Sequence, residues 1–440
     1  MFEKICLKDI AGYEEEKIEA RKIIEILKNH DKYARMGAYI PKGLILSGQP
    51  GVGKTMFAKA IACESGAPFY QLEVDEYETE SKVVKSIKEL FAEARKSSPS
   101  IIFIDEFDEL VMTDEFTSDY SRKITKTLLS EIDGISSSEG VLVIATTNYK
   151  SMLPSALMRS GRMDKRITIE MPNTSDRQAI FEYYLKKNSN LDEINTRLLA
   201  LKTTDFSGAD IKTLINETII DCATQEIDKI TVSDFERNIP VVLFQEIKKK
   251  SKNGPDDITC YHEIGHFIIE YKMSGLVGSI STERYGNIQG HVHFEKENIE
   301  NEKITKNNLK RKLTTILGGL AAEEIMCGDI SSGSSNDVNK AKAIISQMIN
   351  IGAFGFDKMP ICINGGRFSR GESTMSERRL EEVENIHTNL LNEALENAKS
   401  LIESNKKLAK TIYNNLKEKE KLSKIEIEDI LKNFEESETI

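Results

Sequence analysis

The sequence predicts a doubly wound α/β domain and a small helical domain, followed by a mainly α-helical domain. From Gly43 to about Pro172, short apolar runs flanked by turn or polar residues alternate with amphipathic helical stretches. Buried strands separated by helices are typical of a parallel sheet covered on both faces. After Pro172 helical patterns dominate. A chain of 440 residues is long enough for two or three such domains.

Each element rests on a short stretch of sequence. The predicted strands are "GLILSG", "SIIFIDE", "VLVIATT" and "RITIEM", and "SKVVKSIKELFAEARK" has the apolar spacing of a helix. The charged segment "QEIKKKSKNGPDD" contains a Gly-Pro pair, which is typical of a linker. We therefore predict the α/β domain at residues 1–172, its small helical domain at 173–242, a linker at 243–257 and the last domain at 258–440.

The composition limits the class of protein. With 39% hydrophobic and 30% charged residues, the chain is typical of globular proteins rather than disordered ones. A net charge of -11 argues against nucleic acid as the main partner. No stretch approaches the roughly 18 to 20 apolar residues that span a bilayer, and the N-terminus has no signal-peptide core. We expect a cytoplasmic chain with no integral membrane segment and with six reduced, mostly structural cysteines.

The stretch "GQPGVGKT" fits the phosphate-loop pattern G-x-x-x-x-G-K-[ST], after a strand-like run and before a helical one. Backbone N–H groups of such a loop surround the phosphates, Lys54 reaches the β and γ oxygens, and Thr55 binds Mg²⁺. The alternative is that this Gly-rich stretch is only a tight turn and binds no nucleotide. We predict an ATP site formed by Gly48, Gln49, Pro50, Gly51, Val52, Gly53, Lys54, Thr55 and Met56.

Polar residues also follow two other predicted strands. Asp105 and Glu106 end "IIFIDE"; the first suits the magnesium shell and the second suits a base that polarises the attacking water. Capping of the next turn is the alternative reading. Asn148 ends "VLVIATTN", at the strand edge where open α/β sheets bind ligands.

The stretch "LPSALMRSGRMDKR" completes a resemblance to the AAA+ ATPases. The resemblance implies that Asn148 is the sensor and that Arg159 and Arg162 reach the γ-phosphate of a neighbouring subunit. The active form would then be a homo-hexameric ring, whereas a surface ion pair is the alternative for the two arginines. By the same resemblance, "DIAGYEE" places Ala11 beside the adenine, and "FSGAD" places Gly208 and Ala209 in the lid near the nucleotide.

A second kind of chemistry is indicated by "YHEIGH". In a helix, His262 and His266 lie one turn apart on one face, so both can bind one Zn²⁺ ion. Glu263 lies beside them and can take a proton from water, whose pKa zinc lowers to about 7. A pair of core histidines without metal is the alternative.

Zinc needs a third protein ligand and an open position for water. The candidates are Glu323 and Glu324 in "LGGLAAEEIMCG" and Asp337 in "SSGSSNDVNKA". His291 and His293 in "GHVHF" share one face of a predicted strand, so a competing site is an alternative, although polar residues on a strand surface are commoner.

The whole chain, from about residue 8, resembles the FtsH-type ATP-dependent zinc metalloproteases. "IPKG", "YHEIGH", "LGGLAAEEI" and "SSGSSND" carry the resemblance. The resemblance implies that Asp337 is the third zinc ligand and that Glu323 and Glu324 have supporting roles. It also implies that ATP-driven unfolding delivers protein substrates to a zinc endopeptidase. The alternatives are an AAA+ remodeller with weak or no proteolysis and an ATP-regulated peptidase limited to unfolded chains.

The chain departs from the family pattern in two places. Members usually begin with membrane-spanning helices, which this sequence lacks, and a start at Met1 favours a soluble relative over a trimmed chain. The stretch that should form the substrate-gripping pore loop, "YQLEVDEYETESKVVKSIKEL", has no glycine and is acidic, with Tyr77 near its expected tip. We therefore expect weak unfolding of stable proteins and a preference for basic segments.

Overall fold

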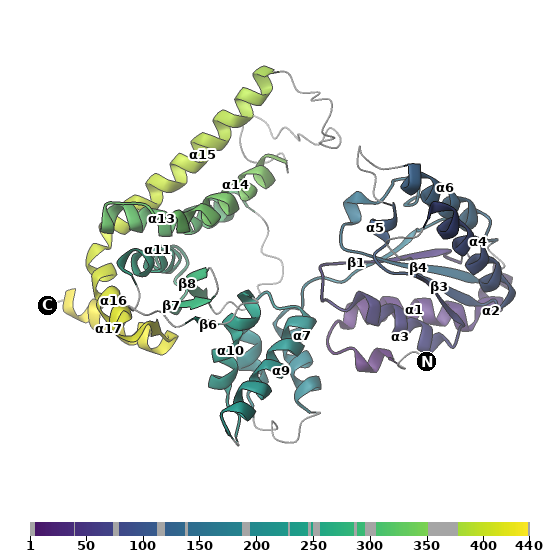
Figure 1. Ribbon diagram of the computed structural model, residues 1–440, viewed down its shortest axis with the longest axis horizontal. Coiled ribbons are helices and arrows are strands. Elements are labelled where there is room, and N and C mark those ends of the chain that lie inside the picture. The colour runs from purple at the N-terminus through teal and green to yellow at the C-terminus, as the bar shows by residue number, and fades with distance from the viewer. Residues whose placement is uncertain are drawn as a thin grey trace. The chain divides into compact units, whose positions relative to one another are not determined.

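In the computed structural model the chain forms two compact units, Met1–Phe235 and Glu236–Ile440. Figure 1 shows the secondary structure of both units. The structure describes residues 5–38, 40–73, 79–111, 119–136, 140–186, 194–227, 229–244, 248–249, 256–285, 288–294, 305–350 and 377–438. Tyr77, which the sequence places near the tip of the predicted pore loop, lies outside these ranges with the rest of residues 74–78.

The described part of the first unit contains a five-stranded parallel sheet with the order β2-β3-β4-β1-β5. Its strands are β1 (Gly43–Ser47), β2 (Phe69–Leu72), β3 (Ser100–Ile104), β4 (Val141–Thr147) and β5 (Lys165–Thr168). Every residue of β1, β3 and β4 is buried, because helices cover both faces of these strands (Figure 1). The predicted α/β fold is confirmed, although the short, half-buried strand β2 was not predicted.

Helices of the first unit cover the sheet with regularly spaced apolar residues. They are α1 (Glu14–Lys28), α2 (His30–Arg35), α3 (Lys54–Ser65), α4 (Glu80–Lys96), α5 (Phe107–Val111) and α6 (Asp119–Asp133), with short 3₁₀ turns η1 (Leu7–Asp9) and η2 (Lys150–Met152). In α4, Val83, Ile87, Phe91 and Ala94 are fully buried at helical spacing. They join the core formed by β3, β4 and α6.

The small helical part consists of α7 (Thr174–Leu185), α8 (Thr196–Lys202), α9 (Gly208–Thr224) and α10 (Val232–Phe244). Asn173 and Ser207 form capping boxes that start α7 and α9. The division between the two units falls inside α10, whereas the sequence predicted a linker at 243–257. Part of that predicted linker, Lys248–Lys249, forms strand β6.

The second unit is mainly helical, as predicted. It contains α11 (Asp257–Ser274), α12 (Lys306–Ile316), α13 (Gly318–Ala322), the π-helical turn η3 (Glu323–Cys327), the 3₁₀ turn η4 (Ser332–Ser334), α14 (Ser335–Asn350), α15 (Glu377–Ser404), α16 (Lys406–Lys419) and α17 (Lys424–Glu438). Antiparallel strands β6, β7 (Gly278–Tyr285), β8 (Ile288–Phe294) and β9 (Lys421–Leu422) form a small sheet.

Helix α11 lies in the core of the second unit and contacts α13 closely. A Cβ atom built on Gly265 would lie 2.2 Å from the carbonyl oxygen of Gly318 and 2.7 Å from Cβ of Ala322. The two helices can approach this closely only because Gly265 and Gly318 have no side chains. This contact sets the position of "HEIGH" relative to the chain that follows α13.

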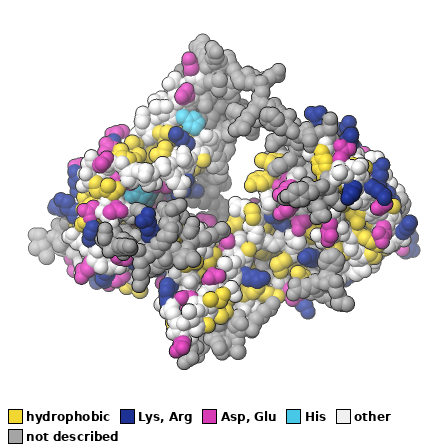
Figure 2. Space-filling view, in the orientation of Figure 1, with side chains coloured by type: hydrophobic (Ala, Val, Ile, Leu, Met, Phe, Trp, Pro, Cys, Tyr) yellow, Lys and Arg dark blue, Asp and Glu magenta, His cyan; other side chains and the backbone are white. Residues whose placement is uncertain are grey.

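The described surface carries basic and acidic side chains side by side on the face drawn in Figure 2. Within the part of the chain that the structure describes, no helix combines the length and the apolar character needed to cross a bilayer.

Candidate functional site

The predicted phosphate loop connects β1 to the N-terminus of α3. Gly53 has a φ of 102° and precedes the first helical residue, Lys54. A Cβ atom on Gly48 would lie 2.1 Å from the carbonyl oxygen of Ile169, so this position requires glycine. Within the loop the side chain of Val52 is buried, and Met56 lies in the first turn of the helix. The backbone N–H groups at the start of α3 are the donors that bind phosphate in such loops.

The Lys54 ammonium group lies at the centre of the loop. It donates hydrogen bonds to the carbonyl oxygens of Gly48 (3.0 Å) and Gln49 (2.8 Å) and to Oδ1 of Asn148 (2.7 Å). Burial lowers the pKa of Lys54, and the carboxylate of Asp105 partly opposes this effect. The structure thus brings the lysine and the predicted sensor asparagine into direct contact.

Three oxygen-bearing side chains meet at the ends of β3 and β4. The hydroxyl of Thr55 donates to the Asp105 carboxylate at 3.2 and 3.3 Å, and the hydroxyl of Thr146 donates to its Oδ1 at 2.5 Å. The N–H of Glu106 donates to Thr146 Oγ1 at 3.0 Å. Glu106 has a φ of 50°, which is uncommon outside glycine and occurs at strained functional positions. Sequence reasoning did not identify Thr146.

Of the two further segments that the AAA+ resemblance places near the nucleotide, one contacts this loop and the other contacts α7. The N–H of Ala209 donates to the carbonyl oxygen of Gly51 at 3.1 Å, at the start of α9, so Gly208 and Ala209 lie beside the loop. The segment that contains Ala11 ends at Tyr13, whose N–H donates to Asp176 Oδ1 at 2.8 Å. The first contact thus connects α9 to the phosphate loop, and the second connects the segment that contains Ala11 to α7.

The two predicted arginine fingers differ in their surroundings. Arg162 forms a two-pronged ion pair with Asp133, at 2.7 and 2.6 Å, and also donates to the carbonyl oxygen of Ala156 at 2.6 Å. This pair raises the pKa of Arg162 and lowers that of Asp133. Arg159 is exposed, and no described residue pairs with its guanidinium group.

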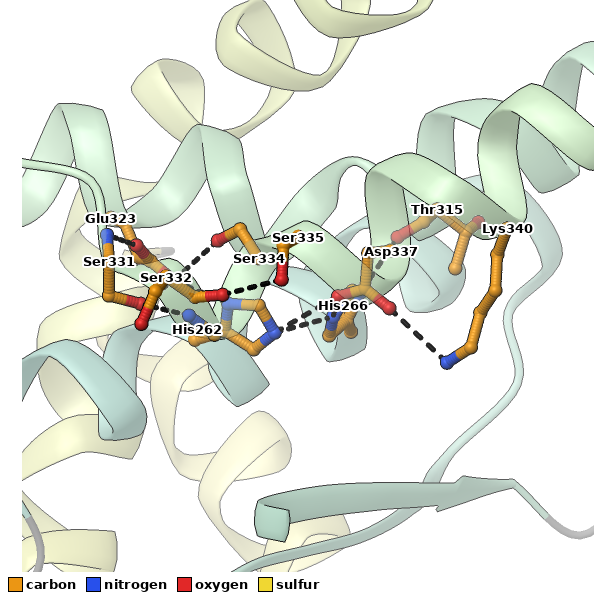
Figure 3. A network of polar contacts seen from close by, with 11 residues as sticks. His262, His266, Thr315, Glu323, Ser331, Ser332, Ser334, Ser335, Asp337 and Lys340 are labelled. Carbon is orange, nitrogen blue, oxygen red and sulfur yellow. Dashed lines mark hydrogen bonds and ion pairs between the residues drawn. The ribbon is translucent and has the colours of Figure 1, made fainter. Parts of the chain in front are cut away.

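The second site is built on α11, which starts at an N-cap in which Asp256 accepts a hydrogen bond from the N–H of Thr259. His262 Nε2 and His266 Nε2 lie 3.1 Å apart, and each lies 3.2 Å from Asp337 Oδ2 at the start of α14 (Figure 3). These three atoms form a nearly equilateral triangle, and among the described residues the three side chains form a cluster with metal-ligand spacing.

The triangle fits Zn²⁺ in size and in charge. Ligand atoms about 2.0–2.1 Å from a tetrahedral zinc ion lie about 3.3 Å from one another, close to the separations found here. Burial alone would lower the pKa of His262, but hydrogen bonds with Asp337 and Glu323 outweigh burial and raise it to about 10. The site therefore favours positive charge between these side chains.

The outer nitrogens of both imidazoles are held by the surrounding protein (Figure 3). His262 Nδ1 lies 2.6 Å from Glu323 Oε1, and His266 Nδ1 lies 2.9 Å from the carbonyl oxygen of Thr315. Glu323 is fully buried and accepts hydrogen bonds from Ser331 and Ser334. Each Nδ1 thus donates its proton outward, so that Nε2 of each ring is the nitrogen that can bind a metal ion in place of a proton.

Glu323 and Glu324, the two alternative candidates for the third zinc ligand, contact different parts of the second unit. Both oxygens of Glu323 are occupied by His262 and the two serines, and Glu324 pairs with Lys399 of α15 at 2.8 Å. The family resemblance implied a supporting role for these glutamates. Thr315, Ser331 and Ser334 were not identified, because a single sequence gives no signal for contacts of this kind.

We expect Glu323→Ala to weaken zinc binding about 10- to 100-fold, because partners of metal-bound histidines have effects of this size. Glu324→Ala is the matched control, since it removes only a partly exposed ion pair and should leave zinc affinity unchanged. Competition with a chelator of known affinity measures both variants. Equal zinc affinity in the two variants would contradict this assignment of roles.

Glu263 is 5% exposed and lines the cavity beside the triangle. Burial raises its pKa to about 7, although the two neighbouring histidines oppose this shift. A Cβ atom on Gly290 of β8 would lie 2.6 Å from Glu263 Oε1, so the carboxylate rests directly against the strand backbone. A carboxylate with this pKa is well suited to accept and return a proton near neutral pH.

The competing histidine site is not formed among the described residues. His291 packs edge-on against Phe244 and Tyr285, with ring centroids 5.5 and 6.1 Å away, and burial lowers its pKa to about 4. His291 and His293 line a cavity of about 920 Å³ together with Glu263, His266 and Lys340, but neither joins the ligand cluster.

Two family models match this chain, one over each of the regions described above. The family model of the ATPase family associated with various cellular activities (AAA) covers residues 44–171, and that of peptidase family M41 covers 246–430. The chain is 32% identical over 451 residues to the ATP-dependent zinc metalloprotease FtsH of Thermotoga maritima, covering 97% of this chain and 73% of the relative. The protein of the same name from Bacillus subtilis is 32% identical over 455 residues, covering 97% and 70% of the two chains. A third, from Acaryochloris marina, is 33% identical over 448 residues, covering 97% and 68%.

Proposed function

We propose a residue-level mechanism for this chain, which belongs to the FtsH family of ATP-dependent zinc metalloproteases. It carries the AAA ATPase and the M41 peptidase in that order, and it is an ATP-dependent zinc protease that uses Mg²⁺ with its nucleotide. In our proposal ATP hydrolysis in the first unit moves protein substrates, and the second unit hydrolyses their peptide bonds.

In the peptidase, we assign the zinc ligands to His262 Nε2, His266 Nε2 and Asp337 Oδ2. When bound there, Zn²⁺ would lower the pKa of a water molecule to about 7 and polarise the substrate carbonyl. Glu263 accepts the proton of the attacking water and returns it to the leaving amine. Glu323 and the carbonyl of Thr315 hold the imidazoles in the required tautomer.

In the ATPase, Lys54 would bind the phosphates of ATP, and Thr55 and Asp105 would supply oxygen atoms for the magnesium shell. Glu106 orients the attacking water, and Asn148 senses the γ-phosphate. Arg159, which is exposed, is the better candidate for a residue that acts on a neighbouring subunit, and this role requires an assembly that we propose is a homo-hexamer. Arg162 is committed to Asp133 in its own subunit.

The ligand triangle carries this proposal, because separations of 3.1 and 3.2 Å bring together residues 71 positions apart in the sequence. Carboxylates and imidazoles gather this closely where they share a cation or a proton, and a zinc ion satisfies all three lone pairs.

The test compares Asp337→Ala with Asp329→Ala, an exposed aspartate from the same stretch. Asp337→Ala should release zinc and abolish degradation of casein, while ATP hydrolysis continues. Asp329→Ala should match the wild type in zinc content and in ATP-dependent degradation. Full zinc occupancy in Asp337→Ala would contradict the ligand assignment, and degradation of casein without ATP would contradict the coupling of the two units.

A further inference from the structure

Two thiols of the ATPase unit lie in contact. Cys6 Sγ and Cys63 Sγ are 3.3 Å apart, although 57 positions separate them in the sequence, and both residues are half-buried. Cys6 immediately precedes η1, and Cys63 lies near the end of α3, the helix that begins at the phosphate loop. A disulfide is about 2.05 Å long, so the sulfurs need to approach by only about 1.3 Å.

The segment around Cys6 is held against α3 at both ends, which keeps the thiols in register. We call residues 6–13 the N-terminal strap. Near its start, the N–H of Leu7 donates to Glu64 Oε1 at 2.8 Å, next to Cys63. At its end, the ring of Tyr13 packs edge-on against Phe57 of α3, with centroids 6.1 Å apart. Leu7, Ile10 and Tyr13 are each 5% exposed or less.

We propose that Cys6 and Cys63 are a redox modification site, at which a two-electron oxidant of the peroxide class forms a reversible disulfide that fastens the N-terminal strap to α3. The thiolate of one cysteine attacks one peroxide oxygen and becomes a sulfenic acid, and the other oxygen leaves as water. The sulfur of the second cysteine then attacks the sulfenic sulfur, forms the S–S bond and displaces a second water. Two thiols and one hydrogen peroxide thus give one disulfide and two water molecules.

The hydrogen bond with Cys63, together with burial, raises the pKa of Cys6. Both thiols are reachable by a small oxidant because neither is fully buried.

The bond would fix a segment that connects several parts of the nucleotide site. The strap contains Ala11 and ends at the hydrogen bond from Tyr13 to Asp176 at the start of α7. Its opposite end would become covalently joined to α3, which carries Lys54 and Thr55. Oxidation would therefore oppose local opening of the strap and raise the thermal stability of the ATPase unit.

The test uses the full chain, reduced or treated with one equivalent of hydrogen peroxide. Peptide mapping should recover a Cys6–Cys63 linked peptide that dithiothreitol removes. The Tm of the ATPase unit should rise by at least about 4 °C on oxidation and return on reduction. This comparison needs no variant and uses neither ATPase nor peptidase activity, so its failure is distinguishable from failure of the proposed function.

Cys6→Ser and Cys63→Ser should each lose the linked peptide and the Tm rise, whereas Cys327→Ser, a half-buried thiol of the other unit, should retain both. Absence of the linked peptide in folded, oxidised protein would overturn the proposal. A linked peptide with an unchanged Tm would overturn the conclusion that the bond fastens the strap.

Discussion

Replacing Glu263 with Gln leaves zinc in place and lowers peptide-bond hydrolysis by a factor of about 10² to 10⁴, the range expected for loss of a general base. The amide has the shape of the carboxylate but cannot accept the proton of the attacking water. The zinc ligands are unchanged, and burying a neutral side chain at this 5% exposed position adds no desolvated charge. Zinc content, casein cleavage and ATP hydrolysis are measured on the same preparation.

Glu324→Gln is the matched control for this experiment. It makes the same chemical change in a glutamate that pairs with Lys399 outside the ligand triangle, so proteolysis should stay near the wild-type rate. If Glu263→Gln cleaves casein as fast as Glu324→Gln does, the general base is another residue.

Arg159→Ala should lower ATP hydrolysis by a factor of about 10³ or more while leaving ATP binding intact, because an arginine supplied to the transition state has an effect of this size. Glu106→Gln should also bind ATP and turn it over very slowly. Mixing the two inactive variants should restore activity, since some interfaces then combine an intact Glu106 with an intact Arg159. Phosphate release from verified mixed assemblies measures the recovery.

Arg162→Ala provides the comparison, because Arg162 holds Asp133 and the carbonyl of Ala156 within its own subunit. Its loss should lower the Tm, whereas Arg159→Ala, at an exposed position, should not. Mixed assemblies of Arg159→Ala and Glu106→Gln that remain inactive would show that Arg159 does not act between subunits.

The parts of the fold and the sites that could be predicted from the sequence are those specified by residues close together in the chain. Strands β1, β3 and β4 are continuous apolar runs because both of their faces are covered, and the phosphate loop contains its own donors within eight residues. His262 and His266 share a helix face through spacing alone. Asp337 is different, because its distance along the chain carries no geometric information and only family resemblance singled it out.

The parts that were missed depend on tertiary contacts. Thr146 contacts Asp105 only because β3 and β4 are neighbours in the sheet, and Glu323 reaches His262 only because α13 packs against α11. Strand β2 was not predicted because its half-buried residues give neither a continuous apolar run nor a clean alternation. Arg159 and Arg162 have the same chemistry in the sequence, and only the position of Asp133 distinguishes them.

The contact between Gly265 and Gly318 has a bearing on how related sequences are judged. If a related chain is judged only by the two histidines, the glutamate and the aspartate of the zinc site, it is counted as an active protease whenever all four are present. Yet a methyl group at either glycine would push α13 away from α11, and with it the buried glutamate that orients His262. We expect related chains that keep every zinc ligand but lose this pair of glycines to be proteolytically inactive. A search of genomes for inactive family members should therefore examine these two glycines as well as the metal ligands.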